Sequence, residues 1–258
     1  MEDQQVSKKQ QKRLDRMARK DEEKKGYQRS RLGRSFLIWT LVILILVGLV
    51  WALVLLVSSK TDSEPLSAGN IPAIGEGDWT KGNPDAQLEL VEYSDFQCPA
   101  CASYFPIVTQ LLEEYENEIL FAYRHFPLRS IHPHAQLAGQ AAEAAGQQDQ
   151  FWAMHDLIFE NQLAWSRQIR PKASFVEYAS QLSLDLEQFE ADMESNETEQ
   201  EVNADFNSGE RAGVPGTPTF FLNGEMIQSP RSLDEFKALI DTALEAANTN
   251  GSDQSADN

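Results

Sequence analysis

Cysteine is scarce in this chain of 258 residues, which contains only Cys98 and Cys101. A small secreted fold held together by disulfides needs more cysteines, spread more widely along the chain, so this chain does not belong to that class. Histidine is also scarce, with four residues, and no second cysteine pair is present to complete a structural zinc site. The two cysteines, three positions apart, therefore need a chemical explanation rather than a structural one.

Charged residues are missing from residues 36–57, which are almost entirely apolar. A helix of this length is about 33 Å long and can cross a hydrocarbon core of about 30 Å. A buried core helix is rarely apolar all round for so long. A cleaved signal peptide usually has a shorter apolar core and a small-residue cleavage site, which residues 58–60 do not supply. We therefore predict an uncleaved transmembrane signal-anchor at 36–57.

Positive charge is concentrated before this span. Residues 1–35 contain twelve Lys or Arg and six Asp or Glu, a net charge of +6, which leaves −24 for the rest of a chain whose total is −18. The positive-inside bias then predicts a single-pass protein of the cell membrane, with a basic cytoplasmic arm at 1–35 and the remainder extracytoplasmic. A basic segment beside a span is typical of contact with anionic lipid, which we favour over nucleic acid as the partner of the arm.

One domain follows the span. Residues 58–77 are rich in Ser, Pro and Gly and are predicted to be a linker. Residues 248–258 are small and polar and are predicted to be a disordered tail. The domain is therefore expected over 78–247.

The first half of this domain has the pattern of a strand, a helix and a strand. Residues 87–93 are apolar on both faces, as expected of a central, buried strand. Apolar residues at helical spacing follow from Cys98 to about residue 117, and residues 119–123 form the next strand candidate. This order predicts a parallel pair of strands with a right-handed crossover.

The second half begins with helices and ends with a hairpin. Residues 131–209 contain no convincing strand and are predicted to be a helical insert. Two short strands, 219–222 and 225–227, surround an Asn-Gly pair, which is a strong hairpin signal. A final helix is predicted over 232–246. The fold class is therefore α/β.

Cys98, Pro99, Ala100 and Cys101 lie where the first strand gives way to the helix. Pro99 suits the first helical position, so Cys98 is expected at the helix N-terminus, where free N–H groups and the helix dipole stabilise a thiolate. Cys98 is then the nucleophile, and Cys101, one turn later, is the buried resolving thiol.

Two other interpretations of the pair are open. A passive disulfide would constrain little chain, because the loop between the cysteines is so short. A metal site would need further ligands, for which His125, His132, His134 and His155 are the candidates. His125 and His155 are more simply interpreted as structural histidines.

The FQCPAC sequence at 96–101 resembles the active site of the DsbA family of thiol–disulfide oxidoreductases, which have the thioredoxin fold. The chain is similar above all to the single-pass, membrane-anchored DsbA-like proteins of bacteria with little or no periplasm. Four further stretches carry the resemblance: RHFPL at 124–128, FWAMHDLIFENQ at 151–162, the helical insert itself and GTPTFFLNG at 216–224. The resemblance implies a thioredoxin fold with an inserted helical subdomain, preceded here by one transmembrane helix.

The resemblance also implies roles for further residues. Thr217 and Pro218 match the cis-proline loop that faces the disulfide, where the Thr217 backbone would meet a substrate strand and Pro218 would block access to stray metal or sulfur. Pro218 is otherwise a turn residue at the start of a strand. Glu92 matches a buried acid beneath the cysteines that would take the proton of Cys101; its alternative is an exposed strand glutamate. No cofactor is implied beyond the redox-active disulfide of Cys98 and Cys101.

The function implied by the resemblance is disulfide formation in exported proteins. The implied partners are reduced exported proteins as substrates and an integral-membrane, quinone-linked thiol oxidase that restores the disulfide. Ala100 departs from the family's strongest oxidants, which carry histidine before the second cysteine, so a reductase remains an alternative. Isomerases of the family carry a separate dimerisation region before the catalytic domain, whereas here only the predicted linker of 58–77 precedes it, so an isomerase is disfavoured. A metal-binding protein is the alternative of a different class.

Overall fold

The computed structural model describes residues 44, 46, 48 and 71–254. The chain divides into two units, Met1–Glu64 and Pro65–Asn258, and the fold described below is that of the second unit. The predicted basic arm, and the predicted anchor apart from residues 44, 46 and 48, lie outside the described residues. Within the described part of the chain, no helix combines the length and the apolar character that a membrane span requires.

A five-stranded sheet forms the centre of the described fold, with the strand order β1-β3-β2-β4-β5. Its strands are β1 (Trp79–Gly82), β2 (Leu88–Ser94), β3 (Ile119–His125), β4 (Thr219–Leu222) and β5 (Glu225–Met226). The predicted parallel pair is confirmed, because β2 runs parallel to β3 over its whole length. The hairpin between β4 and β5 turns at Asn223 and Gly224, both of which have positive φ, as the sequence predicts.

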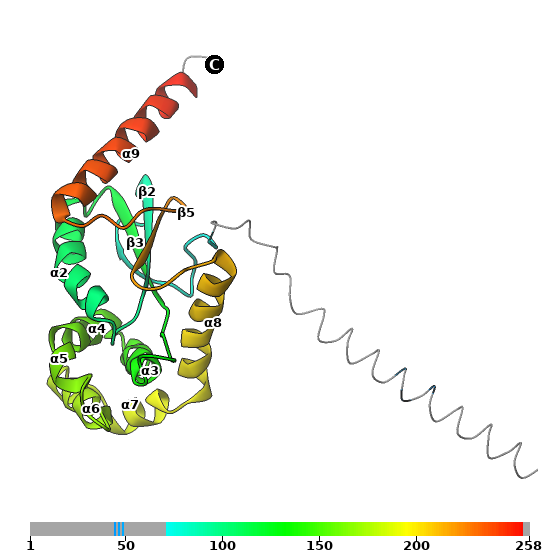
Figure 1. The fold of residues 1–258 in the computed structure, drawn as a ribbon, viewed down its shortest axis with the longest axis vertical. Helices are drawn as coiled ribbons and strands as arrows, with labels where there is room; N and C mark the ends of the chain where they lie inside the picture. The colour runs from blue at the N-terminus through cyan, green and yellow to red at the C-terminus, as the bar shows by residue number, and fades with distance from the viewer. Residues whose placement is uncertain (1–43, 45, 47, 49–70, 255–258) are drawn as a thin grey trace, which may run out of the picture. The chain divides into compact units, whose positions relative to one another are not determined.

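Helices cover both faces of this sheet. Helices α2 (Pro99–Glu114) and α9 (Leu233–Gln254) lie on one face, where their buried side chains join those of Leu88 and Leu90 in one apolar core. Helix α8 (Asn196–Ala212) lies on the other face, where Val91 joins a second apolar cluster. Figure 1 shows α2 and α9 to one side of the strands and α8 to the other. The predicted α/β thioredoxin-like fold is therefore confirmed.

A group of helices separates β3 from the final hairpin, as predicted for residues 131–209. Figure 1 shows most of this group at one end of the domain, while α9 projects from the opposite end. The group consists of α3 (Ala135–Gly146), α4 (Phe151–Glu160), α5 (Gln162–Trp165), α6 (Lys172–Gln181) and α7 (Leu186–Met193), followed by α8.

Two elements differ from the sequence-based expectations. The four-residue edge strand β1 was not predicted, because its alternating exposure is set by antiparallel pairing with β3 and not by a local apolar pattern. Helix α9 continues through residues 248–254, which were expected in a disordered tail. Once a helix is nucleated, each added residue gains a hydrogen bond, so a polar sequence can prolong it.

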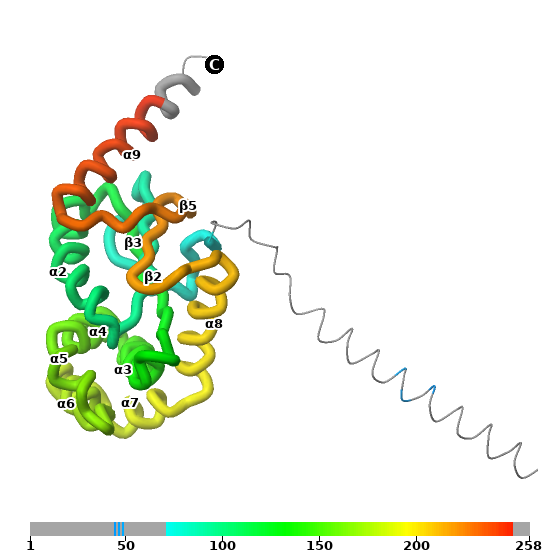
Figure 2. Tube along the Cα trace, viewed as in Figure 1, coloured from blue at the N-terminus to red at the C-terminus, as the bar shows by residue number. Residues whose placement is uncertain are grey.

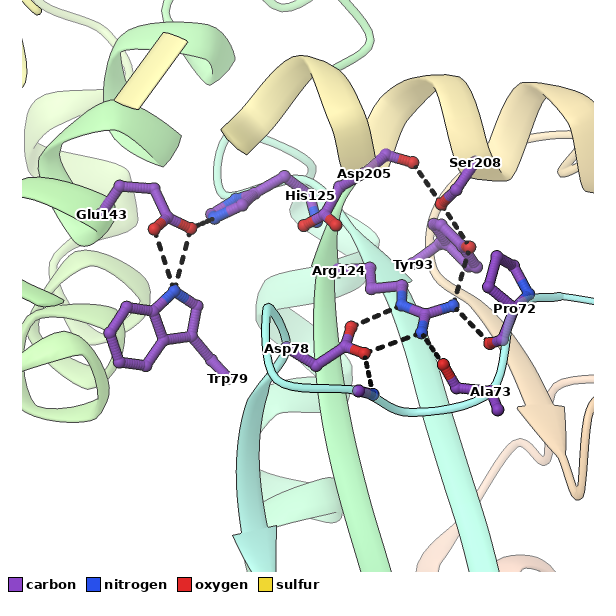
Figure 3. A network of polar contacts seen from close by, with 11 residues as sticks. Pro72, Ala73, Asp78, Trp79, Tyr93, Arg124, His125, Glu143, Asp205 and Ser208 are labelled. Atoms are coloured by element: carbon purple, nitrogen blue, oxygen red, sulfur yellow. Dashed lines mark hydrogen bonds and ion pairs between the residues drawn. The ribbon is translucent and has the colours of Figure 1, made fainter. Parts of the chain in front are cut away.

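Residues 71–78, which we call the N-terminal strap, are fixed to the domain by Arg124 (Figure 3). The Arg124 guanidinium donates two hydrogen bonds to the Asp78 carboxylate, at 2.6 and 2.9 Å, in a nearly buried ion pair. It also donates to the carbonyl oxygens of Pro72 and Ala73, at 3.1 and 3.2 Å. The strap includes the end of the predicted linker, so this arginine fixes where the chain joins the domain.

A second set of polar contacts continues this network across the sheet. Glu143 of α3 accepts hydrogen bonds from the Trp79 indole at 2.9 and 3.0 Å, and its carboxylate lies 2.8 Å from Nε2 of His125 (Figure 3). The backbone N–H of His125 donates to Asp205 of α8 at 2.9 Å. His125 is thus a structural residue whose ring and backbone both have hydrogen-bond partners, and it links β3 to α3 and α8.

We expect Arg124→Met to lower the free energy of unfolding by about 3–5 kcal/mol, because it leaves the buried Asp78 carboxylate without its partner. The same substitution at the exposed Arg167, Arg167→Met, should change stability by less than about 0.5 kcal/mol. Urea denaturation of the two variants and the wild type measures both effects. Equal midpoints for the two variants would contradict this role of Arg124.

Candidate active site

Cys98 and Cys101 lie at the start of α2, immediately after the central strand. Cys98 is the N-cap residue and Pro99 is the first helical residue, as predicted. The Cys98 side chain is 6% exposed, whereas Cys101, one turn later, is fully buried. Both are free thiols in the structure. Because a substrate sulfur can approach only an accessible atom, Cys98 is the thiol that the geometry offers for attack.

The two thiols have pKa values displaced in opposite directions. The pKa of Cys98 is lowered to about 5, chiefly by a hydrogen bond from the Cys101 thiol. The backbone N–H groups of Ala100 and Cys101 at the helix start and the Thr217 side chain lower it further, while burial opposes the shift. The pKa of Cys101 is raised well above its usual value, first by burial and then by its contact with Cys98.

Thr217 and Pro218 lie opposite the cysteines, and the peptide bond between them is cis. The Thr217 carbonyl oxygen lies 3.5 Å from the Cys98 sulfur. The antiparallel pairing of β4 with β2, in which Thr219 is the partner of Tyr93, brings this loop to the end of the central strand. The structure thus brings together the two cysteines and the two loop residues that the sequence singled out, although they lie far apart in the chain.

Glu92 lies on the face of β2 that α2 covers, and it is 5% exposed. Burial raises its pKa to about 7, while the nearby Ser94 hydroxyl lowers it and the charge of Cys98 raises it further. When it is charged, Glu92 in turn raises the pKa of Cys101. The predicted acid is therefore buried and electrostatically coupled to both thiols, and it titrates near neutrality.

Three polar residues that sequence reasoning missed hold the turn between β2 and α2. Asp95 accepts hydrogen bonds from the backbone N–H groups of Gln97 and Leu128, at 2.7 and 2.9 Å. Gln162 of α5 donates to the carbonyl oxygens of Phe96 and Cys98, both at 2.8 Å. Gln97 donates from its side chain to the Ser166 carbonyl oxygen at 3.1 Å, which ties the turn to the chain after α5.

These contacts fix the direction of α2 relative to the helical group, and Figure 2 shows the start of α2 beside that group. A local signal existed only for Asp95, since an aspartate two residues before its backbone donor is typical of an Asx turn. Gln162 carried no such signal, because its partners lie more than 60 residues earlier in the chain.

Three of the four histidines weighed as metal ligands have separate acidic neighbours. His125 lies beside Glu143, His132 beside Asp95 at 2.7 Å, and His155 beside Asp156 at 2.8 Å. Burial lowers the pKa of His155 to about 4, so that its ring is neutral at physiological pH. Within the described residues, no group of three His, Cys, Asp or Glu side chains is arranged to hold a metal ion.

Comparison with known proteins identifies the family. The model of a family described as Thioredoxin matches residues 75–242, more than half of the chain. Among curated proteins, the chain is 36% identical over 177 residues to the Na(+)/H(+) antiporter NhaA 3 of Salinispora tropica, and 37% identical over 174 residues to NhaA 1 of Salinispora arenicola. These matches cover 69% and 67% of this chain but only 26% of each relative. The chain thus spans about a quarter of the length of these curated relatives.

Solved structures show a similar fold at low sequence identity. BdbD from Bacillus subtilis in its oxidised form gives a TM-score of 0.62 at 21% identity, covering 69% of this chain and 98% of that one. α-DsbA1 from Wolbachia pipientis gives 0.61 at 18% identity, covering 69% and 96%. At these identities the similarity shows the shared fold alone.

We expect Cys101→Ala to raise the pKa of Cys98 from about 5 by more than one unit, toward the unperturbed value of about 8.5. The substitution removes the hydrogen bond that contributes most to the lowering. Thiolate absorbance at 240 nm, followed against pH in the reduced full-length chain, measures the shift. Ser103→Ala, which alters the same helix without touching either sulfur, is the control. If the pKa stayed near 5 in Cys101→Ala, the helix N-terminus would be the dominant cause instead.

Proposed function

The chain belongs to the thioredoxin family whose model it matches, and from that membership and its site we propose that it is an extracytoplasmic thiol–disulfide oxidoreductase. It forms disulfides in exported proteins through Cys98 and Cys101. The observation that carries the proposal is the opposite displacement of the two cysteine pKa values. A thiolate that is stable at neutral pH is a good leaving group, and a site that stabilises its reduced form holds an oxidising disulfide.

The reaction proceeds by two thiol–disulfide exchanges. A thiolate of the reduced substrate attacks the accessible Cys98 sulfur of the Cys98–Cys101 disulfide, forming a mixed disulfide and releasing the Cys101 sulfur as a thiolate. A second substrate thiolate attacks the substrate sulfur of the mixed disulfide and releases Cys98 as a thiolate. Two electrons pass from the substrate to the protein, and the substrate gains a disulfide.

Glu92 supplies and accepts the proton of the buried thiol. With a pKa of about 7, it is about half protonated at neutral pH. Released Cys101 takes this proton, because its own pKa is raised well above the usual value. When the disulfide is restored, Cys101 returns the proton to Glu92. A group that titrates near the working pH is suited to both directions of this transfer.

We propose that electrons flow from the substrate to this protein, so that it acts as an oxidase and not as a reductase. The pKa of Cys98, about 5, lies between those of the corresponding cysteines of thioredoxin, about 7, and DsbA, about 3.5. This low value supports an oxidase although Ala100 replaces the histidine of the strongest oxidants.

The proposal has three further parts. An integral-membrane, quinone-linked thiol oxidase restores the disulfide. A transmembrane anchor at 36–57 holds the protein in the membrane, and the basic arm contacts anionic lipid.

A redox titration of the full-length chain against thiol–disulfide buffers tests the direction. We expect a potential nearer about −120 mV, the value of a strong oxidant, than about −270 mV, that of thioredoxin. The Cys98→Ser variant should lose the oxidation of a reduced, unfolded substrate. The Cys98 thiolate of Cys101→Ser should still attack a substrate that already contains a disulfide and accumulate the mixed disulfide, because no second thiol is present to release it. A potential near the lower value would make the protein a reductase, and oxidation by Cys98→Ser would refute the mechanism.

The role of Glu92 predicts a pH dependence. The rate of release of the mixed disulfide by Cys101 should rise with pH and level off above about 7, because ionised Glu92 accepts the Cys101 proton. Glu92→Gln should slow this step about 10²–10⁴-fold and remove the inflection near pH 7. Glu89→Gln, on the opposite face of the same strand, is the matched control in single-turnover measurements. An unchanged inflection in Glu92→Gln would assign the titration to another group.

A further inference from the structure

A cavity of about 800 Å³ lies on the α2 side of the sheet, bounded by β1, β2, β3, α2 and α4. Its volume falls within the range of sites that bind small molecules. Neither cysteine lines it, and neither does Thr217 or Pro218, so it is separate from the accessible edge of Cys98. The mechanism proposed above gives this cavity no occupant.

Four aromatic side chains lie among the polar and aliphatic residues that line the cavity. Phe105, Phe121, Trp152 and Phe159 contribute rings from α2, β3 and α4. Ring faces attract organic cations through their quadrupoles, and cages of aromatic side chains are used to recognise ammonium groups. The site already shows this interaction, because the Lys81 ammonium nitrogen lies 4.4 Å from the centre of the Trp152 ring.

Glu92 supplies a carboxylate inside the cavity. Its side chain lines the cavity although it is 5% exposed, so its access to solvent lies on that side. Among the described residues no ion-pair partner reaches this carboxylate, and the nearby Ser94 hydroxyl does not meet normal hydrogen-bond geometry. A buried carboxylate without a counter-ion is a costly arrangement, which a bound cation would relieve.

The other charged groups at the cavity also favour a cation. Glu113 of α2 and Glu116, which follows the end of this helix, are exposed at the cavity and add negative charge. Asp156 is paired with Lys81 at 3.7 Å, which offsets both charges. His155 is neutral because burial lowers its pKa to about 4, so it does not repel a positive ligand.

We propose that this cavity binds a small arylalkylammonium ion, whose ammonium group pairs with the Glu92 carboxylate and whose aromatic body packs against Phe105, Trp152 and Phe159. The aromatic walls account for an apolar body, and the unpaired acid accounts for a positive head. A neutral alcohol of the same shape would gain the apolar contacts alone. An anionic analogue would meet Glu92 and the two exposed glutamates unfavourably.

Isothermal titration calorimetry with the full-length oxidised chain at pH 8 tests the proposal. The probes are 2-phenylethylamine, which is positively charged at this pH, and the alcohol 2-phenylethanol, which has the same number of heavy atoms. We expect the amine to bind at least ten-fold more tightly than the alcohol. Lowering the pH from 8 to 6 should weaken amine binding several-fold, because Glu92 becomes protonated, and should leave alcohol binding unchanged.

Variants locate the site. Glu92→Gln should abolish the ten-fold preference for the amine, whereas Glu89→Gln should retain it. Thr109→Phe, which places a ring in the cavity, should weaken both probes. Equal binding of the two probes, a preference that survives in Glu92→Gln, or no binding of the amine would each overturn the proposal. Thiol–disulfide exchange assayed on the same samples is a separate readout, so failure of the ligand proposal is distinguishable from failure of the proposed function.

Discussion

The site depends on the position of β2 at the centre of the sheet. Hydrogen bonds to β3 on one side and to β4 on the other fix this strand along nearly all of its length. Cys98 follows directly from its end, and the pairing with β4 carries Thr217 to within 3.5 Å of the Cys98 sulfur. Glu92 is held beneath α2 by the alternation of side chains along the same strand. A shift of register by one residue would turn Glu92 to the face of α8 and separate it from the thiols.

The chemical difference between the two cysteines follows from one helical turn. The N-cap position leaves Cys98 accessible and gives it the free N–H groups of the helix start. Three residues later the helix has entered the core, so Cys101 is fully buried. The contact between the two sulfurs lowers the pKa of Cys98 and raises the pKa of Cys101, because the proton that Cys101 retains stabilises the Cys98 thiolate. Burial of one partner is thus what lowers the pKa of the other.

The sequence predicted those parts of the molecule that local patterns encode. The CPAC turn, the apolar character of both faces of β2 and the Asn-Gly hairpin lie within short segments and were placed correctly. Glu92 and the Thr217–Pro218 bond were singled out only through resemblance to a known family. The edge strand β1, the Gln162 contacts and the aromatic cavity could not be predicted, because each is made by residues brought together from distant parts of the chain.

Glu92 links the two proposed activities, because it belongs to both the thiol site and the cavity. Its pKa is raised by burial and by the Cys98 thiolate, so the reduced and oxidised forms of the protein differ in the charge of this group. An ammonium ion that pairs with Glu92 favours its ionised form and lowers its pKa. In the oxidised form no Cys98 thiolate opposes the ionisation of Glu92. A larger fraction of Glu92 is therefore ionised near pH 7 in the oxidised form than in the reduced form. The negative charge of the Cys98 thiolate, which acts on Glu92 in the reduced form, also attracts a cation bound there. Ligand binding and the redox potential are therefore thermodynamically coupled through the charge of one carboxylate, that of Glu92.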